Sequence, residues 1–259
     1  MDLFIESIRW IHVSAGFVGL SAFWVPIFTR KGGANHRLFG KVFKYCAYIV
    51  LGGAMISVAV HTGTGLAEGA GPRKTPGSFA FLMFLGYLAL VTYVGLRHGL
   101  AVLENKRDLS AMNLAANRFM AWLAITASTA LIIYSIYFKP PNMVILFALS
   151  PIGFGIGSGI LKAIKGRRPE KKAWFYEHMG SMIGTGIAFH TAFAVFGLSR
   201  IYDLGLTGFA SVIPWILLAL IGIPGTFIWT RYYMRKFNDI PARKLTMASQ
   251  HGTDNGTQL

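Results

Sequence analysis

Histidine is the residue type in this sequence whose number and placement best fit chemistry. Seven histidines occur among 259 residues, and six of them lie within or beside long apolar segments. Titratable side chains are costly in such segments and therefore often functional, and neutral imidazole binds transition metals and haem iron and also transfers protons. The six candidate ligands are His12, His36, His61, His98, His178 and His190.

The six histidines fall into two groups by depth. We expect His12 and His190 about 12 Å and about 10 Å below one membrane surface, at a rise of about 1.5 Å per residue. His61 ends an apolar segment at the same side. The second group, at the opposite side, consists of His98, His178 and His36. We expect each group to hold a b-type haem or a transition metal, which would allow electron transfer across the membrane. His12 and His190 are the first candidate pair of ligands.

Helical spacing limits which histidines can share a cofactor. His178 and His190 are 12 residues apart, which separates them by about 120° around an α-helix. They cannot face one bundle axis unless the helix bends. The alternative for each histidine is a hydrogen-bonded structural role, or an interfacial one with the ring reaching toward water.

Apolar composition identifies the elements that position these histidines. The chain is 54% hydrophobic and 14% charged, whereas about a quarter of residues are charged in soluble domains. Seven segments reach the length of about 20 residues that crosses the hydrocarbon layer as a helix. We place them at 4–28, 42–61, 79–100, 119–138, 143–161, 174–198 and 206–229. The sequence therefore predicts an all-α, polytopic bundle of seven transmembrane helices.

The basic residues predict the orientation of this bundle. Of 25 lysines and arginines, 20 fall in the connections and the tail on one side of the spans. Basic connections remain in the cytoplasm, so we expect the N-terminus outside, the C-terminus inside, and a location in the cell inner membrane. Residues 1–237 form the predicted bundle, and residues 238–259 a polar, disordered tail. The basic residues behind the net charge of +15 then lie next to anionic lipid headgroups. We therefore expect no nucleic-acid partner.

Carboxylates are absent from the middle of the predicted spans. All ten lie at span ends or in connections, which disfavours a carboxylate relay and a paired-carboxylate enzyme. Glycines occur at helical spacing in the fifth and sixth spans, and they predict close helix packing within the chain or a homodimer. The pairs are Gly153 with Gly157, Gly155 with Gly159, and Gly180 with Gly184.

A basic, glycine-containing stretch joins the first two spans. Lys31, His36 and Arg37 surround two adjacent glycines there. Glycine permits a sharp reversal of the chain, and the basic groups can anchor this turn to lipid phosphates. The same three side chains are also a candidate site for an anionic ligand or lipid on the cytoplasmic side.

This stretch carries a resemblance to a known family. The segments IHVSAG at 11–16, RKGGANHRLFG at 30–40 and AWFYEHM at 173–179 resemble the bacterial membrane protein family catalogued as domain of unknown function 2306. The similarity covers about the first 60 residues and the sixth span. It implies a multi-pass membrane protein and no established activity, and His190 lies outside the family's pattern.

The hypothesis that we carry forward is transmembrane electron transfer through histidine-ligated haem b or a metal, with an unknown redox partner. A second hypothesis is a transporter or small-molecule sensor with a pocket inside the bundle, because glycine-rich and broken helices can line such sites. A metal-dependent intramembrane hydrolase needs clustered histidine and aspartate near a metal-bound water, and no aspartate lies within a span. A non-catalytic scaffold is the remaining alternative.

Overall fold

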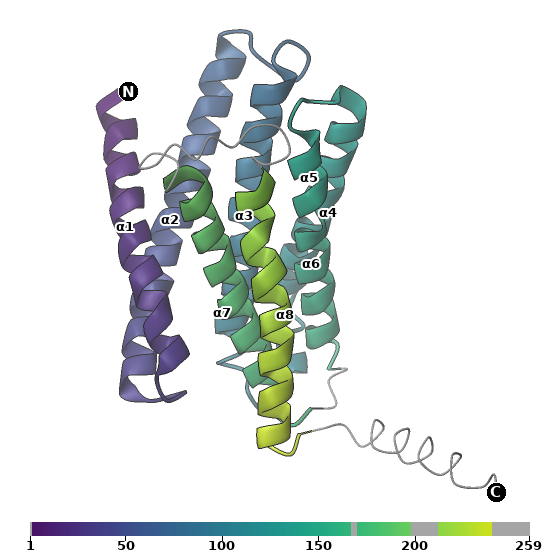
Figure 1. Ribbon diagram of the computed structural model, residues 1–259. Helices are drawn as coiled ribbons and strands as arrows, with labels where there is room; N and C mark the ends of the chain where they lie inside the picture. The colour runs from purple at the N-terminus through teal and green to yellow at the C-terminus, as the bar shows by residue number, and fades with distance from the viewer. Residues whose placement is uncertain (1, 167–169, 198–211, 240–259) are drawn as a thin grey trace, which may run out of the picture.

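The computed structural model describes residues 2–166, 170–197 and 212–239. Over these residues the chain is helical, and it contains seven segments long and apolar enough to cross a membrane. Figure 1 shows the long helices side by side in one bundle. The prediction of an all-α, seven-span membrane protein is confirmed. The elements are α1 (Asp2–Phe28), α2 (Ala34–Ala67), α3 (Pro76–Ala101), η1 (Leu109–Met112), α4 (Ala115–Phe138), α5 (Met143–Leu149), α6 (Pro151–Ile164), α7 (Ala173–Ala192), η2 (Phe193–Gly197) and α8 (Ile213–Lys236).

The helices alternate in direction, so the connections gather at two ends of the bundle. We call the basic end the one that holds residues 29–33, 102–114, 165–166 and 170–172 and the end of α8. The N-terminus of α1 lies at the opposite end (Figure 1). Most of the lysines and arginines among the described residues therefore gather at one end, as the sequence predicts. That this end faces the cytoplasm stays a prediction.

Two spans differ in extent from the predicted segments. The second begins at Ala34 and ends at Ala67, beyond the predicted 42–61 at both ends, because helix continues through polar residues that reach water. His36, expected in a loop, therefore lies in the first turn of α2. The last span begins at Ile213 and continues to Lys236, and residues 206–211 of its predicted range lie outside the described residues.

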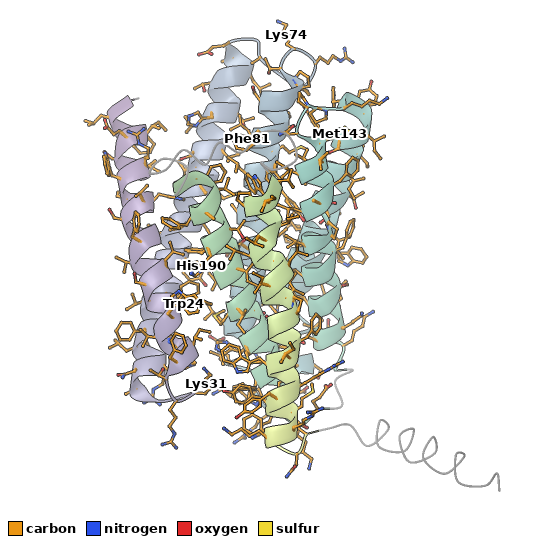
Figure 2. The ribbon with its side chains drawn as sticks, viewed as in Figure 1. Trp24, Lys31, Lys74, Phe81, Met143 and His190 are labelled. Atoms are coloured by element: carbon orange, nitrogen blue, oxygen red, sulfur yellow. The ribbon has the colours of Figure 1, made fainter. Side chains whose placement is uncertain are left out.

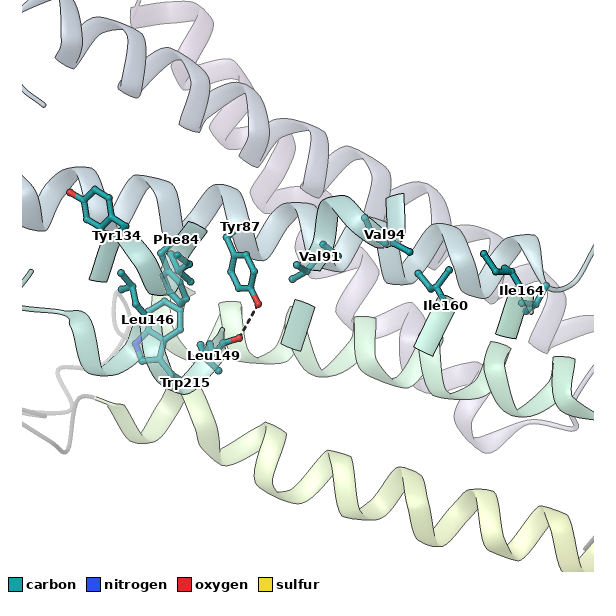
Figure 3. Close-up of a cluster of buried hydrophobic side chains, with 14 of the residues drawn as sticks. Phe84, Tyr87, Val91, Val94, Tyr134, Leu146, Leu149, Ile160, Ile164 and Trp215 are labelled. Carbon is teal, nitrogen blue, oxygen red and sulfur yellow. Dashed lines mark hydrogen bonds between the residues drawn. The ribbon is translucent and has the colours of Figure 1, made fainter. Parts of the chain in front are cut away.

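The main core lies between α3, α4 and the broken fifth span. Buried side chains such as Phe84 and Leu146 fill it (Figure 3), together with Leu131 of α4. α6 approaches α4 closely because two glycines face that helix. A Cβ atom built on Gly153 would lie 2.6 Å from the carbonyl oxygen of Ala124. Glycine packing within the chain is thus confirmed on this face of α6.

The other glycine pairs face open space. A Cβ atom on Gly155, Gly159, Gly180 or Gly184 would meet nothing within 4 Å. At these positions a lipid chain or a helix of another protein can approach the backbone closely. A homodimer through the glycine-rich spans stays a prediction.

A second core joins α1 and α2 to α7. Phe23, Phe43 and Phe189 contact one another there, with ring centroids 5.4 and 5.6 Å apart for the Phe23–Phe43 and Phe43–Phe189 pairs. α1 packs mainly on α2 and touches α7 over a short stretch. The α1–α2 hairpin is therefore linked to the rest of the bundle partly through α7.

Candidate functional site

Two histidines of the basic end lie where α3 meets α7. His98 is 6% exposed, and its Nε2 atom lies 3.1 Å from the Oε2 atom of Glu177. The next residue on each helix forms a second link, because the Nδ1 atom of His178 hydrogen-bonds the carbonyl oxygen of Gly99 at 2.7 Å. These two contacts hold both imidazoles between α3 and α7.

A carboxylate from the chain after α8 holds the start of α7. Asp239 is 6% exposed, and it accepts hydrogen bonds from the backbone N–H groups of Lys171 and Lys172, each at 2.8 Å. The Tyr176 hydroxyl donates to the same carboxylate at 3.2 Å. A carboxylate at a helix N-terminus satisfies free amides and favours the helix dipole. Asp239, from the range predicted as tail, therefore orients the first turns of α7 and with them His178.

The turn between α1 and α2 brings His36 to the same end. The Lys31 ammonium group donates to the carbonyl oxygens of Pro26 and Ile27 at 2.7 and 2.8 Å, at the end of α1 where cations are favoured. The Nδ1 atom of His36 hydrogen-bonds the same Pro26 oxygen at 3.3 Å. His36 and Lys31 thus both pack against the last turns of α1.

Arg37 closes this turn from the other side. Its Nη1 atom donates to the carbonyl oxygen of Gly32 at 3.0 Å, and Gly32 has a φ of 74°, which glycine adopts without strain. Partial burial lowers the pKa of the Lys31 ammonium group below its ordinary value. Lys31 and Arg37 therefore stabilise the turn, and a site for an anionic ligand at Lys31, His36 and Arg37 stays a prediction.

Backbone contacts fix the tautomers of His36 and His178. A carbonyl oxygen can only accept a hydrogen bond, so the Nδ1 atom of each ring carries the proton. In the neutral ring, Nε2 then carries the lone pair that binds a metal. Neither Nε2 atom has a hydrogen-bond partner among the described residues. His98 differs, because its Nε2 atom faces the Glu177 carboxylate.

His178 lies within electrostatic range of two other groups of the basic end, Lys106 and His36. The Lys106 ammonium group lies 4.9 Å from the centre of the Trp174 ring. His36 belongs to α2 and His178 to α7, so the two imidazoles come from different helices at the same end of the bundle.

The predicted pair of His12 and His190 is not brought together. The Nε2 atom of His190 accepts a hydrogen bond from the Trp24 indole at 3.1 Å, and its Nδ1 atom bonds the Gly186 carbonyl oxygen at 2.7 Å. Figure 2 shows Trp24 and His190 next to each other between α1 and α7. His12 precedes Trp24 by 12 residues on the same helix, which is about 18 Å along its axis.

The third member of that group also lies apart. His12 packs against α2, with its Nδ1 atom 3.5 Å from a Cβ atom built on Gly53. His61 is exposed, and its Nδ1 atom bonds the Ser57 carbonyl oxygen of its own helix at 2.7 Å. It lines an open hollow of about 460 Å³ beside Glu6. The three rings therefore occupy three separate sites.

No group of three or more metal-binding side chains is found in the part of the chain that the structure describes. A structural or catalytic zinc site uses three or four protein ligands, whereas haem iron uses one or two axial ligands. Cofactor binding itself stays a prediction.

Sequence reasoning missed three residues whose polar contacts the structure shows. Asp239 was assigned to the tail because the composition turns polar there. Trp24 was counted as one more apolar residue of the first span. Tyr87 bonds the break in the fifth span, described below, and the only signal for it was Pro151 in the facing helix.

Comparisons with known proteins give no relative. No family model matches this chain, and no curated protein or solved structure shows significant similarity to it. The resemblance to domain of unknown function 2306 therefore stays a prediction. The fold establishes the coarser class, a multi-pass membrane protein of seven helical spans.

Proposed function

We propose that this multi-pass membrane protein binds a b-type haem, or a transition metal, between His36 and His178 and passes electrons through it. The observation that supports this function best is the pair of Nδ1 contacts to backbone carbonyl oxygens, at 3.3 and 2.7 Å. Histidines that bind metals commonly donate their second N–H in this way, which orients the ring and leaves Nε2 for the metal.

The charge of the basic end supports the same ligand. Haem carries carboxylate groups, and Lys31, Arg37 and Lys106 are cations at this end. Arg37 uses one N–H group for the Gly32 carbonyl oxygen and has others to donate, since a guanidinium group has five. This assigns the predicted anionic-ligand role of the turn to the carboxylates of the haem.

The location that we propose is the cell inner membrane, with the basic end in the cytoplasm. Its support is the gathering of lysine and arginine in the connections of that end, which is typical of cytoplasmic connections. An electron donor or acceptor would then dock on the cytoplasmic side.

Haem and metal analysis of the purified protein tests this function. We expect about one haem or metal ion per chain, and at least a tenfold loss of binding in His36→Ala and in His178→Ala. His61→Ala is the matched control, because His61 is exposed and bonded within its own helix. An absent Soret band together with absent metal would contradict the proposal. Loss of binding only in His12→Ala and His190→Ala would contradict the proposal and favour the pair of ligands that the sequence predicts.

A second candidate function is transport or sensing of a small molecule inside the bundle. The observation that favours it is the interruption of the fifth span at Ser150 and Pro151, because broken helices line the binding sites of many transporters. Proteoliposome uptake tests it. Selective flux of one solute class would support this function, and equal leakage of all solutes would contradict it.

A further inference from the structure

The fifth span is one transmembrane segment in two helical pieces. It runs from Met143 to Ile164, and it breaks where Ser150 ends α5 and Pro151 begins α6. Proline has no N–H group, and its ring clashes with the carbonyl group four residues earlier, so it interrupts a helix. The break lies about eight residues, or about 12 Å, from the start of the span. It therefore falls inside the hydrocarbon layer.

A side chain from α3 replaces the backbone hydrogen bond that is missing at the break. In a continuous helix, the Gly153 N–H would bond the Leu149 carbonyl oxygen. Here Gly153 donates to the Tyr87 hydroxyl at 2.9 Å. That hydroxyl lies 3.1 Å from the Leu149 oxygen (Figure 3), and it lies 2.9 Å from the Ser150 oxygen. Because a hydroxyl has one proton, it can serve only one of the two carbonyl groups fully at a time.

The other end of α5 has an unsatisfied group. Asn142 precedes the helix, where an asparagine side chain normally accepts a hydrogen bond from the first turn. Its backbone has φ −92° and ψ 15°, and its side chain forms no such bond. Its Oδ1 atom is buried without a partner among the described residues. An unpaired buried amide oxygen is rare and destabilising.

The segment is short and has a turn at its start as well as a break at its end. Lys139, which ends α4, has a left-handed φ of 45°, and two prolines follow it. α5 itself has seven residues and buries Leu146 and Leu149 against the core. It thus makes about two helical turns between the turn at Lys139 and the break in backbone hydrogen bonding at Ser150 and Pro151.

We infer that α5 is a two-state gate that pivots at Ser150 and Pro151 and that the Tyr87 hydroxyl holds shut. In the second state the Tyr87 hydroxyl loses its hydrogen bonds to Gly153 and Leu149. Asn142 then adopts extended backbone geometry, which lets its side chain cap the start of α5. The Leu149 carbonyl and the Gly153 N–H then become available to a small polar guest with a donor and an acceptor, of which water is the simplest. This gate does not depend on haem binding.

Hydrogen–deuterium exchange of the purified full-length protein tests the gate. Tyr87→Phe removes the inserted hydroxyl and keeps the ring, so we expect exchange of residues 143–153 to rise at least about tenfold. Exchange of residues 156–164 should stay unchanged. The matched control is Tyr134→Phe, since Tyr134 also bonds a backbone carbonyl oxygen, that of Pro76, at 3.0 Å. Equal exchange in wild type and Tyr87→Phe would overturn the inference, as would an equal rise over every span.

A second variant covers the case in which Tyr87→Phe unfolds the bundle. Pro151→Ala restores the backbone N–H group of residue 151, so the helix can continue. The Gly153 N–H can then bond the Leu149 carbonyl oxygen directly. The double variant Tyr87→Phe/Pro151→Ala should therefore exchange residues 143–153 at close to the wild-type rate. Exchange that stays fast in this double variant, with a wild-type rate elsewhere, would show that the break is not the pivot.

Discussion

Two regions of this molecule are held together by different kinds of contact. The block of α3, α4 and α6 is joined by apolar packing and by close backbone approach at Gly153 and Gly157. The junction of α3 and α7 at the basic end is also closely packed, because a Cβ atom on Gly99 would lie 2.5 Å from the Ser181 Cβ atom. It differs by its polar contacts, which His36, His98 and His178 form with neighbouring helices or turns. Polar contacts can be exchanged for contacts with a ligand, and they distinguish the candidate site from the packed block.

The largest effect on stability is expected in the packed block. A Cβ atom on Gly157 would overlap the Ala121 carbonyl oxygen and lie 2.6 Å from Ile125 Cγ1. Gly157→Ala should therefore lower the free energy of unfolding by about 1–3 kcal/mol, measured by thermal unfolding in detergent. Gly155→Ala is the matched control, expected to be neutral or to stabilise by up to about 1 kcal/mol, because that position faces open space and alanine favours a helix more than glycine does. Equal unfolding temperatures for both variants would contradict the close approach of α4 and α6.

A smaller effect is expected at the polar junction. Asp239→Ala removes the acceptor of two backbone N–H groups and of the Tyr176 hydroxyl, so it should destabilise the protein by about 1–2 kcal/mol. Hydrogen exchange should accelerate in residues 173–178 and not in the block of α4 and α6. Glu104→Ala, at an exposed carboxylate, serves as the control. Uniform acceleration over the bundle would mean that the two regions are not separate.

The smallest effect concerns pH. Hydrogen bonds from the Ser110 hydroxyl and then from its backbone N–H lower the pKa of Asp108 below its ordinary value. Because the folded-state pKa is depressed, the contribution of Asp108 is present at neutral pH. It is lost as pH falls below about 3.9 and through the folded-state pKa. The Ser110 amide signal in NMR should report this loss, and Ser110→Ala should raise the pKa of Asp108. An unchanged pKa in that variant would exclude the hydrogen bond from the Ser110 hydroxyl as the main cause, since alanine keeps the backbone N–H group.

The spans could be predicted from sequence because their cause is local. Helices must satisfy their own backbone groups in lipid, so length and apolar composition identify them. The extent of α2 was underestimated because helix continues past His36, where the side chains are polar but the backbone still gains from helical hydrogen bonds. Hydropathy measures the side chains and carries no information about that gain.

The grouping of the histidines was harder to predict because it depends on non-local contacts. Depth along a helix follows from residue counting, but the neighbour at that depth depends on tilt and rotation. His12 and His190 were assigned similar depths, yet Trp24 rather than His12 contacts His190. The inner set was identified by the same counting, and its contacts with Gly99 and Glu177 required the packing of α3 on α7.

The central claim is that His36 and His178 present unprotonated Nε2 atoms to one ligand. Nitrogen-15 NMR of histidine-labelled protein, with signals assigned from His36→Ala and His178→Ala, tests it most directly. We predict the Nδ1–H tautomer for both rings, and Nε2 signals that change on addition of haem while those of His61 do not. An Nε2–H tautomer for His178, or Nε2 signals that stay unchanged with haem present, would contradict the claim.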